Sequence, residues 1–126
     1  MTEPVGRLGA TSIDCPDPAA LADFYGALLG MRRLVESPDG SVVAITDGAQ
    51  TLAMMRVAGY VAPTWPEPGQ LQQMHLDVSV SDLDEAVERA VALGARVAEH
   101  QRDPGSWRVL FDPAGHPFCL TTVGAG

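Results

Sequence analysis

The sequence predicts an α+β fold of two tandem βαβββ modules related by pseudo-twofold symmetry, with curved mixed sheets that enclose a cleft and helices outside. The chain nearly repeats itself about 65 residues apart, so that Thr11–Gly30 corresponds to Leu76–Gly94. The ends of the copies also correspond, because ITDGAQTLAMM (residues 45–55) aligns with LFDPAGHPFCL (residues 110–120). A half-domain that cannot bury its apolar face alone must pack against its twin. We therefore expect function in the cleft between the halves.

In the first half, the pattern predicts a strand at Leu8–Asp14 followed by a helix. Asp17 is typical of a helix N-cap, Pro18 suits the first helical position, and Gly30 ends the helix. Apolar residues recur at helical spacing on one face of this helix, at Leu21, Phe24, Tyr25 and Leu28. Turn residues such as Asp47-Gly48 separate the three strands that follow. These strands are expected at Arg32–Glu36, Val42–Thr46 and Thr51–Val57.

The second half repeats this plan. A strand is expected at His75–Val80, and Asp82 with Glu85 three residues later predicts a capping box at the start of a helix that Gly94 ends. The expected buried face of this helix consists of Leu83, Ala86, Val87, Ala90 and Val91. The last three strands are expected at Arg96–Glu99, Trp107–Phe111 and Pro117–Thr122. Their connections are too short for crossovers, so neighbouring strands must pair antiparallel.

Chain length indicates a single domain, residues 1–126, because 126 residues suffice for one core and not for two. Within it we expect module one at about residues 7–57 and module two at about residues 73–123. The segment between them, residues 58–72, is rich in proline and glycine and shows no periodicity, which is typical of a linker.

Composition excludes several classes of function. The net charge is −8 and the chain has no lysine, so no basic stripe is available for nucleic acid. No run of about 18 apolar residues predicts a membrane span, and MTEPVGRLGA lacks the apolar core of a secretory signal. The expected location is the cytoplasm. Cys15 and Cys119 are too few for a disulfide framework, and Cys15 is expected to pack in the core.

Alternation along the strands predicts which side chains face the cleft, because successive residues of a strand point to opposite faces. Apolar residues such as Leu76 and Val78 should contact the helix, which turns the residues between them inward. The same reasoning applies to the first strand of module one and to the last strand of module two. The side chains expected to face the cleft are Ala10, Ser12, Asp14, Met54, His75, Asp77, Ser79, Cys119 and Thr121.

Three segments together give the chain a family resemblance: DPAALADFYGALLGM after the first strand, HLDVSVSDLDEAVERAVALGA at the start of module two, and FDPAGHPFCL near the end. In this order and spacing the chain resembles the vicinal oxygen chelate superfamily, which includes glyoxalase, bleomycin-resistance and extradiol-dioxygenase proteins. The resemblance covers Leu8–Val123. It implies the fold described above and leaves the reaction open.

The resemblance also implies a divalent metal held by His, Gln or Glu side chains from both modules. The matching positions here are Ala10, Met54, His75 and Cys119. Alanine cannot bind a metal and the Met54 thioether suits only soft ions, so we expect no metal cofactor. A noncanonical site of His75, Asp77 and Cys119 is the alternative. The spacing of about 6–7 Å between His75 and Asp77 along the strand is wide for a shared ion.

The first functional hypothesis is a small-molecule-binding protein that sequesters a planar or cationic metabolite or antibiotic. Trp65 and Trp107 offer flat surfaces for stacking at the mouth of the cleft, and the acidic chain favours cations. Ordinary packing is the competing interpretation of each tryptophan. The expected ligand-binding residues are Ser12, Asp14, Met54, Trp65, His75, Asp77, Trp107, Cys119 and Thr121.

The second hypothesis is a glyoxalase-like lyase or isomerase acting on a small oxygenated substrate. Its catalytic residues would be His75 as general base, Asp77 as the group that tunes it, and Cys119 as a thiol donor or nucleophile. A third interpretation is a protein that acts by association. The resemblance implies a homodimer, in which the linker is long enough for an exchange of halves between chains.

Overall fold

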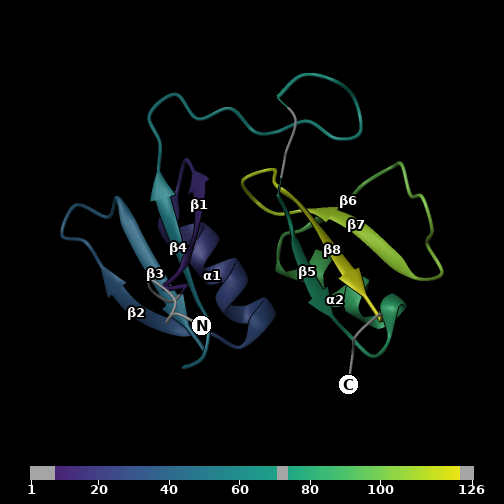
Figure 1. The fold of residues 1–126 in the computed structure, drawn as a ribbon, viewed down its shortest axis with the longest axis horizontal. Helices are drawn as coiled ribbons and strands as arrows, with labels where there is room; N and C mark the ends of the chain where they lie inside the picture. The colour runs from purple at the N-terminus through teal and green to yellow at the C-terminus, as the bar shows by residue number, and fades with distance from the viewer. Residues whose placement is uncertain (1–7, 71–73, 123–126) are drawn as a thin grey trace, which may run out of the picture. The chain divides into compact units, whose positions relative to one another are not determined.

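The computed structural model describes residues 8–70 and 74–122, so the expected module limits at residues 7, 72, 73 and 123 lie outside the described residues. The chain divides into two compact units whose boundary falls between Tyr60 and Val61, inside the expected linker. Each unit contains one four-stranded sheet and one helix (Figure 1). The α+β class and the two-module plan are therefore confirmed, and the arrangement of the modules around a shared cleft stays a prediction.

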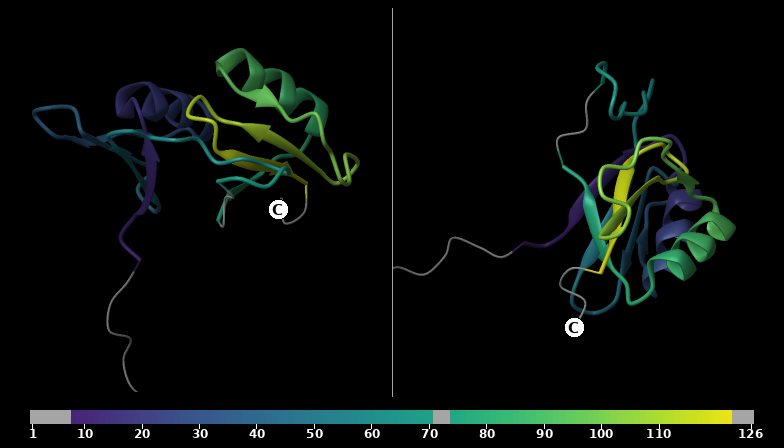
Figure 2. Two further views of the ribbon diagram at one scale, coloured as in Figure 1. Left: turned by 90° about the horizontal axis from the view of Figure 1, so that it is seen from above. Right: turned by 90° about the vertical axis from the view of Figure 1, so that its right-hand side faces the viewer.

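Module one has a mixed sheet with the strand order β1-β4-β3-β2. Its β1 and β4 pair in parallel, whereas the short connections make the β3–β4 and β2–β3 pairs antiparallel, as expected. Its helix α1 lies over one face of this sheet (Figure 2). The elements are β1 (Thr11–Cys15), α1 (Pro18–Leu29), β2 (Arg32–Glu36), β3 (Val42–Thr46) and β4 (Thr51–Arg56).

The ends of α1 are set by the residues that the sequence indicated. The Asp17 side chain caps the helix by accepting a hydrogen bond of 3.2 Å from the Ala20 amide, and Pro18 occupies the first turn. Gly30 ends the helix in the left-handed conformation with φ of 69°, which favours glycine. Five residues of the helix are buried: Pro18, Leu21, Ala22, Phe24 and Tyr25. Cys15 on β1 is fully buried, which confirms its core role.

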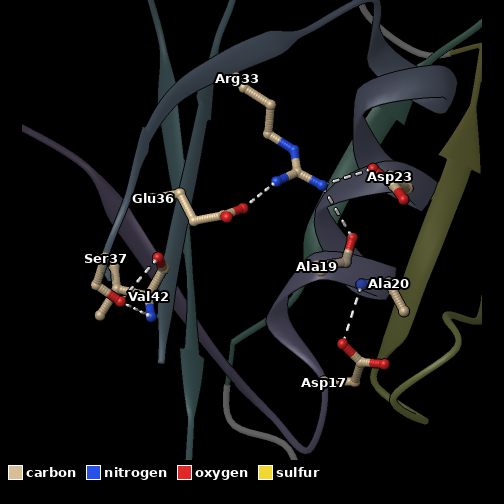
Figure 3. A network of polar contacts seen from close by, with 8 residues as sticks. All are labelled: Asp17, Ala19, Ala20, Asp23, Arg33, Glu36, Ser37 and Val42. Carbon is tan, nitrogen blue, oxygen red and sulfur yellow. Dashed lines mark hydrogen bonds and ion pairs between the residues drawn. The ribbon is translucent and has the colours of Figure 1, made fainter. Parts of the chain in front are cut away.

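Arg33 ties the exposed edge strand β2 to α1 (Figure 3). Its guanidinium donates to Asp23 on the helix at 2.7 Å, to Glu36 on the same strand at 2.6 Å, and to the Ala19 carbonyl at 3.4 Å. Hydrogen bonding to Asp23 is the largest cause that raises the pKa of Arg33. All these groups are exposed, so the network adds little stability.

Module two repeats the arrangement with the strand order β5-β8-β7-β6. Here β5 and β8 pair in parallel, and the other pairs are antiparallel. Its helix α2 again covers one face of its own sheet (Figure 2). The elements are β5 (Leu76–Ser79), α2 (Leu83–Leu93), β6 (Arg96–Val97), β7 (Trp107–Phe111) and β8 (Pro117–Thr121).

The second helix is less buried than expected. Asp82 caps it by accepting from the Glu85 amide at 3.0 Å, and its buried residues are Leu83 and Ala90. The prediction that Val91 is buried is wrong, since its side chain is 45% exposed. Val91 lies about 100° around the helix from Ala90, which places it outside the narrow stripe that Leu83 and Ala90 define.

Part of the expected linker belongs to module two. The Thr64 amide donates to the Gln70 carbonyl at 2.7 Å, which closes this segment on itself. Trp65 packs against a small buried cluster of Ala98, Val109 and Phe111, and the Trp65 ring lies 5.7 Å from that of His100. The segment therefore forms one wall of module two. Among the described residues, no helix is both long and apolar enough to cross a membrane.

Candidate functional site

A pocket of about 550 Å³ lies in module two, lined by one face of three neighbouring strands and by two loop residues. The other face of this sheet carries Phe118 and Leu120, which are buried toward α2. Strand register aligns the pocket residues in rows, with Asp77 opposite Cys119 and Cys119 opposite Val109. The strand residues that line the pocket are Asp77 and Ser79 on β5, Trp107 and Val109 on β7, and Pro117, Cys119 and Thr121 on β8, and His75 lies immediately before β5.

This arrangement confirms the alternation expected for β5 and β8. Leu76 and Val78 are half-buried, while His75, Asp77 and Ser79 between and beside them are exposed on the pocket side. Hydrogen bonding between neighbouring strands keeps paired residues on the same face, so the row of β5 and the row of β8 face the same space. Alternation was therefore sufficient to predict which side chains of these two strands face the pocket.

Two side chains reach the pocket from loops. Trp65 comes from the segment before β5, and Arg102 comes from the loop between β6 and β7, with its guanidinium 6.0 Å from the centre of the Trp65 ring. Gln101 fixes that loop, because its amide group donates to the carbonyls of Ala98 and Val109 and accepts from the Val109 amide, each at 2.9 Å. A rigid loop base therefore positions Arg102 beside Trp65.

His75, Asp77 and Cys119 lie together on this face. The Nε2 atom of His75 is 3.1 Å from Oδ1 of Asp77. One ligand atom from each of the three side chains lies within 4.8 Å of the others. The expectation that His75 and Asp77 are too far apart for a shared ion is wrong. The strand repeat separates their backbones, and the two side chains lean toward each other across it.

The Cys119 thiol is held in its neutral form. Burial raises its pKa above the usual range for cysteine, and the nearby negative charge of Asp77 raises it further. Because the thiolate is the nucleophilic form, these surroundings do not activate Cys119 for attack. A neutral thiol beside a His–Asp pair is instead suited to donating a proton or a hydrogen bond.

The prediction that Met54 faces inward is wrong. Met54 is fully buried and pairs with Val43 and Ile13, on the face of the sheet that α1 covers. The β7–β8 connection, residues 112–116, is one residue longer than the β3–β4 connection, residues 47–50. This insertion changes the offset between the copies, so that Ala53 is the counterpart of Cys119. A one-residue slip turns every side chain to the opposite face.

With this correction, fewer of the metal-binding positions that the superfamily resemblance implies carry a side chain that can bind a metal. The four corresponding positions are now Ala10, Ala53, His75 and Cys119, and neither alanine has an atom that binds a metal. The donor set of a site shared by both modules therefore does not fit this chain. The side chains of His75 and Cys119 with Asp77 beside them belong to module two alone.

The expected ligand-binding residues Ser12 and Asp14 lie on exposed positions of β1 in module one. Ser12 is the counterpart of Asp77 and pairs with Ala53, as Asp77 pairs with Cys119. All residues of the described pocket belong to module two. Of the expected set, the pocket brings together Trp65, His75, Asp77, Trp107, Cys119 and Thr121.

Four pocket residues were not among the expected ligand-binding residues. Ser79 follows from the same alternation as Asp77, and Val109 and Pro117 follow from the strand register once it is known. No pattern in the sequence indicated that Arg102 lines the pocket, because this residue lies in a loop whose path depends on the Gln101 hydrogen bonds.

Solved structures from several proteins share this fold. FosX, a fosfomycin resistance protein from Mesorhizobium loti, is 18% identical with a TM-score of 0.67, over 94% of this chain and 92% of that chain. A glyoxalase/bleomycin resistance protein/dioxygenase family enzyme from Burkholderia phytofirmans is 18% identical with a TM-score of 0.66, over 88% and 94%. Lactoylglutathione lyase from Agrobacterium tumefaciens is 21% identical with a TM-score of 0.59, over 94% and 95%.

No curated protein sequence matches the chain. Identities this low in the solved structures establish the fold and leave the activity open. The family of glyoxalase-like domains matches residues 10–121, which is nearly the whole chain. The sequence resemblance, the two βαβββ modules and this match agree, and the chain belongs to the glyoxalase-like domain family of the vicinal oxygen chelate superfamily.

Proposed function

We propose that this protein binds a small planar ligand, aromatic and carrying a positive charge or hydrogen-bond donors, in the module-two pocket. One observation carries the proposal: both tryptophans of the chain line this pocket together with the His75–Asp77 pair. Ligand pockets combine flat apolar walls with a few polar groups that fix orientation. Trp65 and Trp107 supply the walls, and Asp77 supplies a carboxylate.

The charge around the pocket favours a ligand that carries a positive charge or a hydrogen-bond donor. Asp77 is exposed enough to meet a ligand, with 63% of its side chain accessible, and the chain as a whole carries a net charge of −8. Arg102 beside Trp65 adds a second, opposite charge at the other wall. A planar ligand with its donor groups toward Asp77 and an acceptor toward Arg102 matches this distribution. The hydroxyl groups of Ser79 and Thr121 lie on the same face.

The test uses intrinsic fluorescence, which reports on this pocket because the only two tryptophans of the sequence line it. A panel of planar compounds, with the cationic dye proflavine as the first member, is titrated into the full chain. We expect saturable quenching by the compounds that bind. Trp107→Ala should weaken the affinity about tenfold, the equivalent of about 1.4 kcal/mol. Trp107→Phe, which keeps a flat ring, should retain most of it.

Val91→Ala on the exposed surface of α2 is the distant control and should leave the affinity unchanged. His75→Ala should weaken binding without unfolding the chain, because half of its side chain is exposed. The binding proposal is wrong if no compound in the panel quenches saturably. It is also wrong if calorimetry shows that Trp107→Ala and His75→Ala both bind the ligand with the affinity of the wild type.

A second candidate function is catalysis by a lyase or isomerase, and the His75–Asp77 contact of 3.1 Å favours it. When Nε2–H of His75 donates to Asp77, the lone pair of Nδ1 is left to take a proton from carbon beside a carbonyl group. The Cys119 thiol could return a proton to the resulting enolate. Turnover of a small 2-oxo or 2-hydroxy compound that is lost in His75→Ala, with an altered pH profile in Asp77→Asn, would support this candidate. No turnover across such a substrate set would exclude it.

A further inference from the structure

Within residues 8–70 and 74–122, a single group of three metal-ligating side chains has its ligand atoms in close proximity: His75, Asp77 and Cys119. The ligand atoms, one from each residue, all lie within 4.8 Å of one another. Atoms bound to one Zn²⁺ ion at about 2.0–2.3 Å are separated by roughly 3–4 Å from each other. Small side-chain rotations would therefore bring the three atoms to one ion.

Neighbouring strands hold these residues in place. Asp77 is directly opposite Cys119 in the parallel pairing of β5 with β8, and His75 precedes Asp77 by two residues on the same face. On the other side, β8 is paired with β7 through Val109, which is 4% exposed and packs against Cys119. Cys119 therefore lies on an inner strand, Asp77 on the edge strand β5, and His75 immediately before it. Side chains on or beside paired strands are better positioned than side chains on free loops.

We propose that His75, Asp77 and Cys119 form a site for a thiophilic divalent cation of the Zn²⁺ class, built by module two alone. The nitrogen, oxygen and sulfur donors suit Zn²⁺ or Co²⁺, whereas Mg²⁺ and Ca²⁺ require oxygen ligands. Module one cannot form a second copy, since the three counterparts are Ala10, Ser12 and Ala53. The set shares His75 and Cys119 with the positions that the superfamily resemblance implies, and it differs by including Asp77 and by using no residue of module one.

Three protein ligands leave one position of a tetrahedral ion for a ligand from outside. Since all three side chains line the same pocket as Trp65 and Trp107, a ligand in that pocket could supply the fourth group. A bound ion would act there as a Lewis acid toward an oxygen atom of a pocket ligand. If Nε2 of His75 binds the ion, it cannot also donate to Asp77, so the metal-bound form and the metal-free form would offer different chemistry. The inference goes beyond the proposed binding of planar ligands and does not depend on it.

The test is a calorimetric titration of the metal-free full chain with ZnCl₂, with MgCl₂ as the comparison metal. We expect one equivalent of Zn²⁺ to bind and Mg²⁺ not to bind. Cys119→Ser and His75→Ala should each weaken Zn²⁺ binding by tenfold or more, because each removes one of three ligands. Glu88→Ala, which removes an exposed carboxylate on α2 away from the pocket, should bind Zn²⁺ as the wild type does.

Absorption spectroscopy with Co²⁺ provides a second readout that is independent of activity. A thiolate bound to Co²⁺ gives an intense charge-transfer band in the near ultraviolet, which should appear in the wild type and vanish in Cys119→Ser. Thermal melting of each variant shows whether it is folded. If a variant is unfolded, Asp77→Asn is tested in its place. Absence of stoichiometric Zn²⁺ binding, or equal Zn²⁺ affinity in wild type and Cys119→Ser, would overturn the inference. Proflavine titration of the metal-free chain tests the planar-ligand proposal separately.

Discussion

The two modules share one architecture and differ in the side chains on the face turned away from their helices. In module two this face carries His75, Asp77 and Cys119, whereas module one has small residues at the corresponding positions: Ala10, Ser12 and Ala53. The helices differ in the opposite sense, because α1 buries five residues and α2 buries two. Helix α1 is therefore the better-buried helix, and module two carries the pocket-lining His75, Asp77 and Cys119. The two copies share the fold, and at these positions the side chains able to bind a metal or a proton lie in module two.

Core truncation in module one should have the largest effect on stability. Leu21 is 1% exposed on α1, so Leu21→Ala removes buried methyl groups and leaves a cavity. We expect a loss of about 2–5 kcal/mol in the free energy of unfolding, measured by urea denaturation. Val91→Ala on α2, where the side chain is 45% exposed, should change it by less than about 0.5 kcal/mol. Equal losses in both variants would show that the two helices are packed equally well.

The combined substitution His75→Ala, Asp77→Ser and Cys119→Ala gives module two the residues of module one. We expect Zn²⁺ binding to disappear, while the free energy of unfolding changes by less than about 1 kcal/mol, since these side chains are partly exposed. Calorimetry and urea denaturation on the same preparation measure both quantities. A chain that unfolds on this replacement would mean that the three residues serve packing.

The fold follows from local signals in the sequence, and so does most of the site. Asp17, Asp82, Gly30 and Gly94 mark the helix ends in the sequence and do so in the structure. Alternation correctly placed His75, Asp77 and Cys119 on one face, because a strand has only two faces.

What failed were features that the alternation along a single strand does not determine. Met54 was misplaced because the one-residue difference between two hairpin loops cannot be recognised from an ungapped repeat. The expected wide gap between His75 and Asp77 ignored the freedom of the side chains to rotate. The position of Arg102 depends on the Gln101 hydrogen bonds, which link residues eight positions apart.

Removing the equivalent capping side chain from each helix should have an intermediate effect on the free energy of unfolding. Asp17→Ala and Asp82→Ala each remove one hydrogen bond to an amide of the first helical turn, and each should cost about 1 kcal/mol. Because α2 buries fewer residues, its amides should exchange with solvent faster in Asp82→Ala than those of α1 do in Asp17→Ala. Hydrogen exchange measured by NMR tests this difference, and the reverse order would contradict the comparison.

Alkylation of Cys119 should report the charge of Asp77. Because burial and Asp77 both raise the pKa of this thiol, less thiolate is present at any given pH, and iodoacetamide should react more slowly than with a free cysteine. The rate should rise as pH increases through and above the usual cysteine range. Asp77→Asn lowers the pKa, so the reaction at pH 8 should become several-fold faster. Cys119→Ser, which retains the buried Cys15, gives the background rate.

The smallest effect is expected for the surface network of module one. Arg33→Ala breaks the ion pairs with Asp23 and Glu36, whose side chains are 74% and 53% exposed. We expect a loss of less than about 1 kcal/mol that diminishes further in high salt. Urea denaturation at low and high ionic strength measures it. A loss that is large and independent of salt would indicate that Arg33 supports packing of β2 on α1.

A chemical-shift map of the binding surface tests most directly whether module two carries the binding chemistry. Proflavine is titrated into the isotopically labelled chain, and the backbone amide shifts are followed by NMR. We predict that the largest changes occur at the indole N–H groups of Trp65 and Trp107 and in β5, β7 and β8, around the pocket. Changes centred instead on β1 and β4 of module one, or a spectrum that the dye leaves unchanged, would contradict this account.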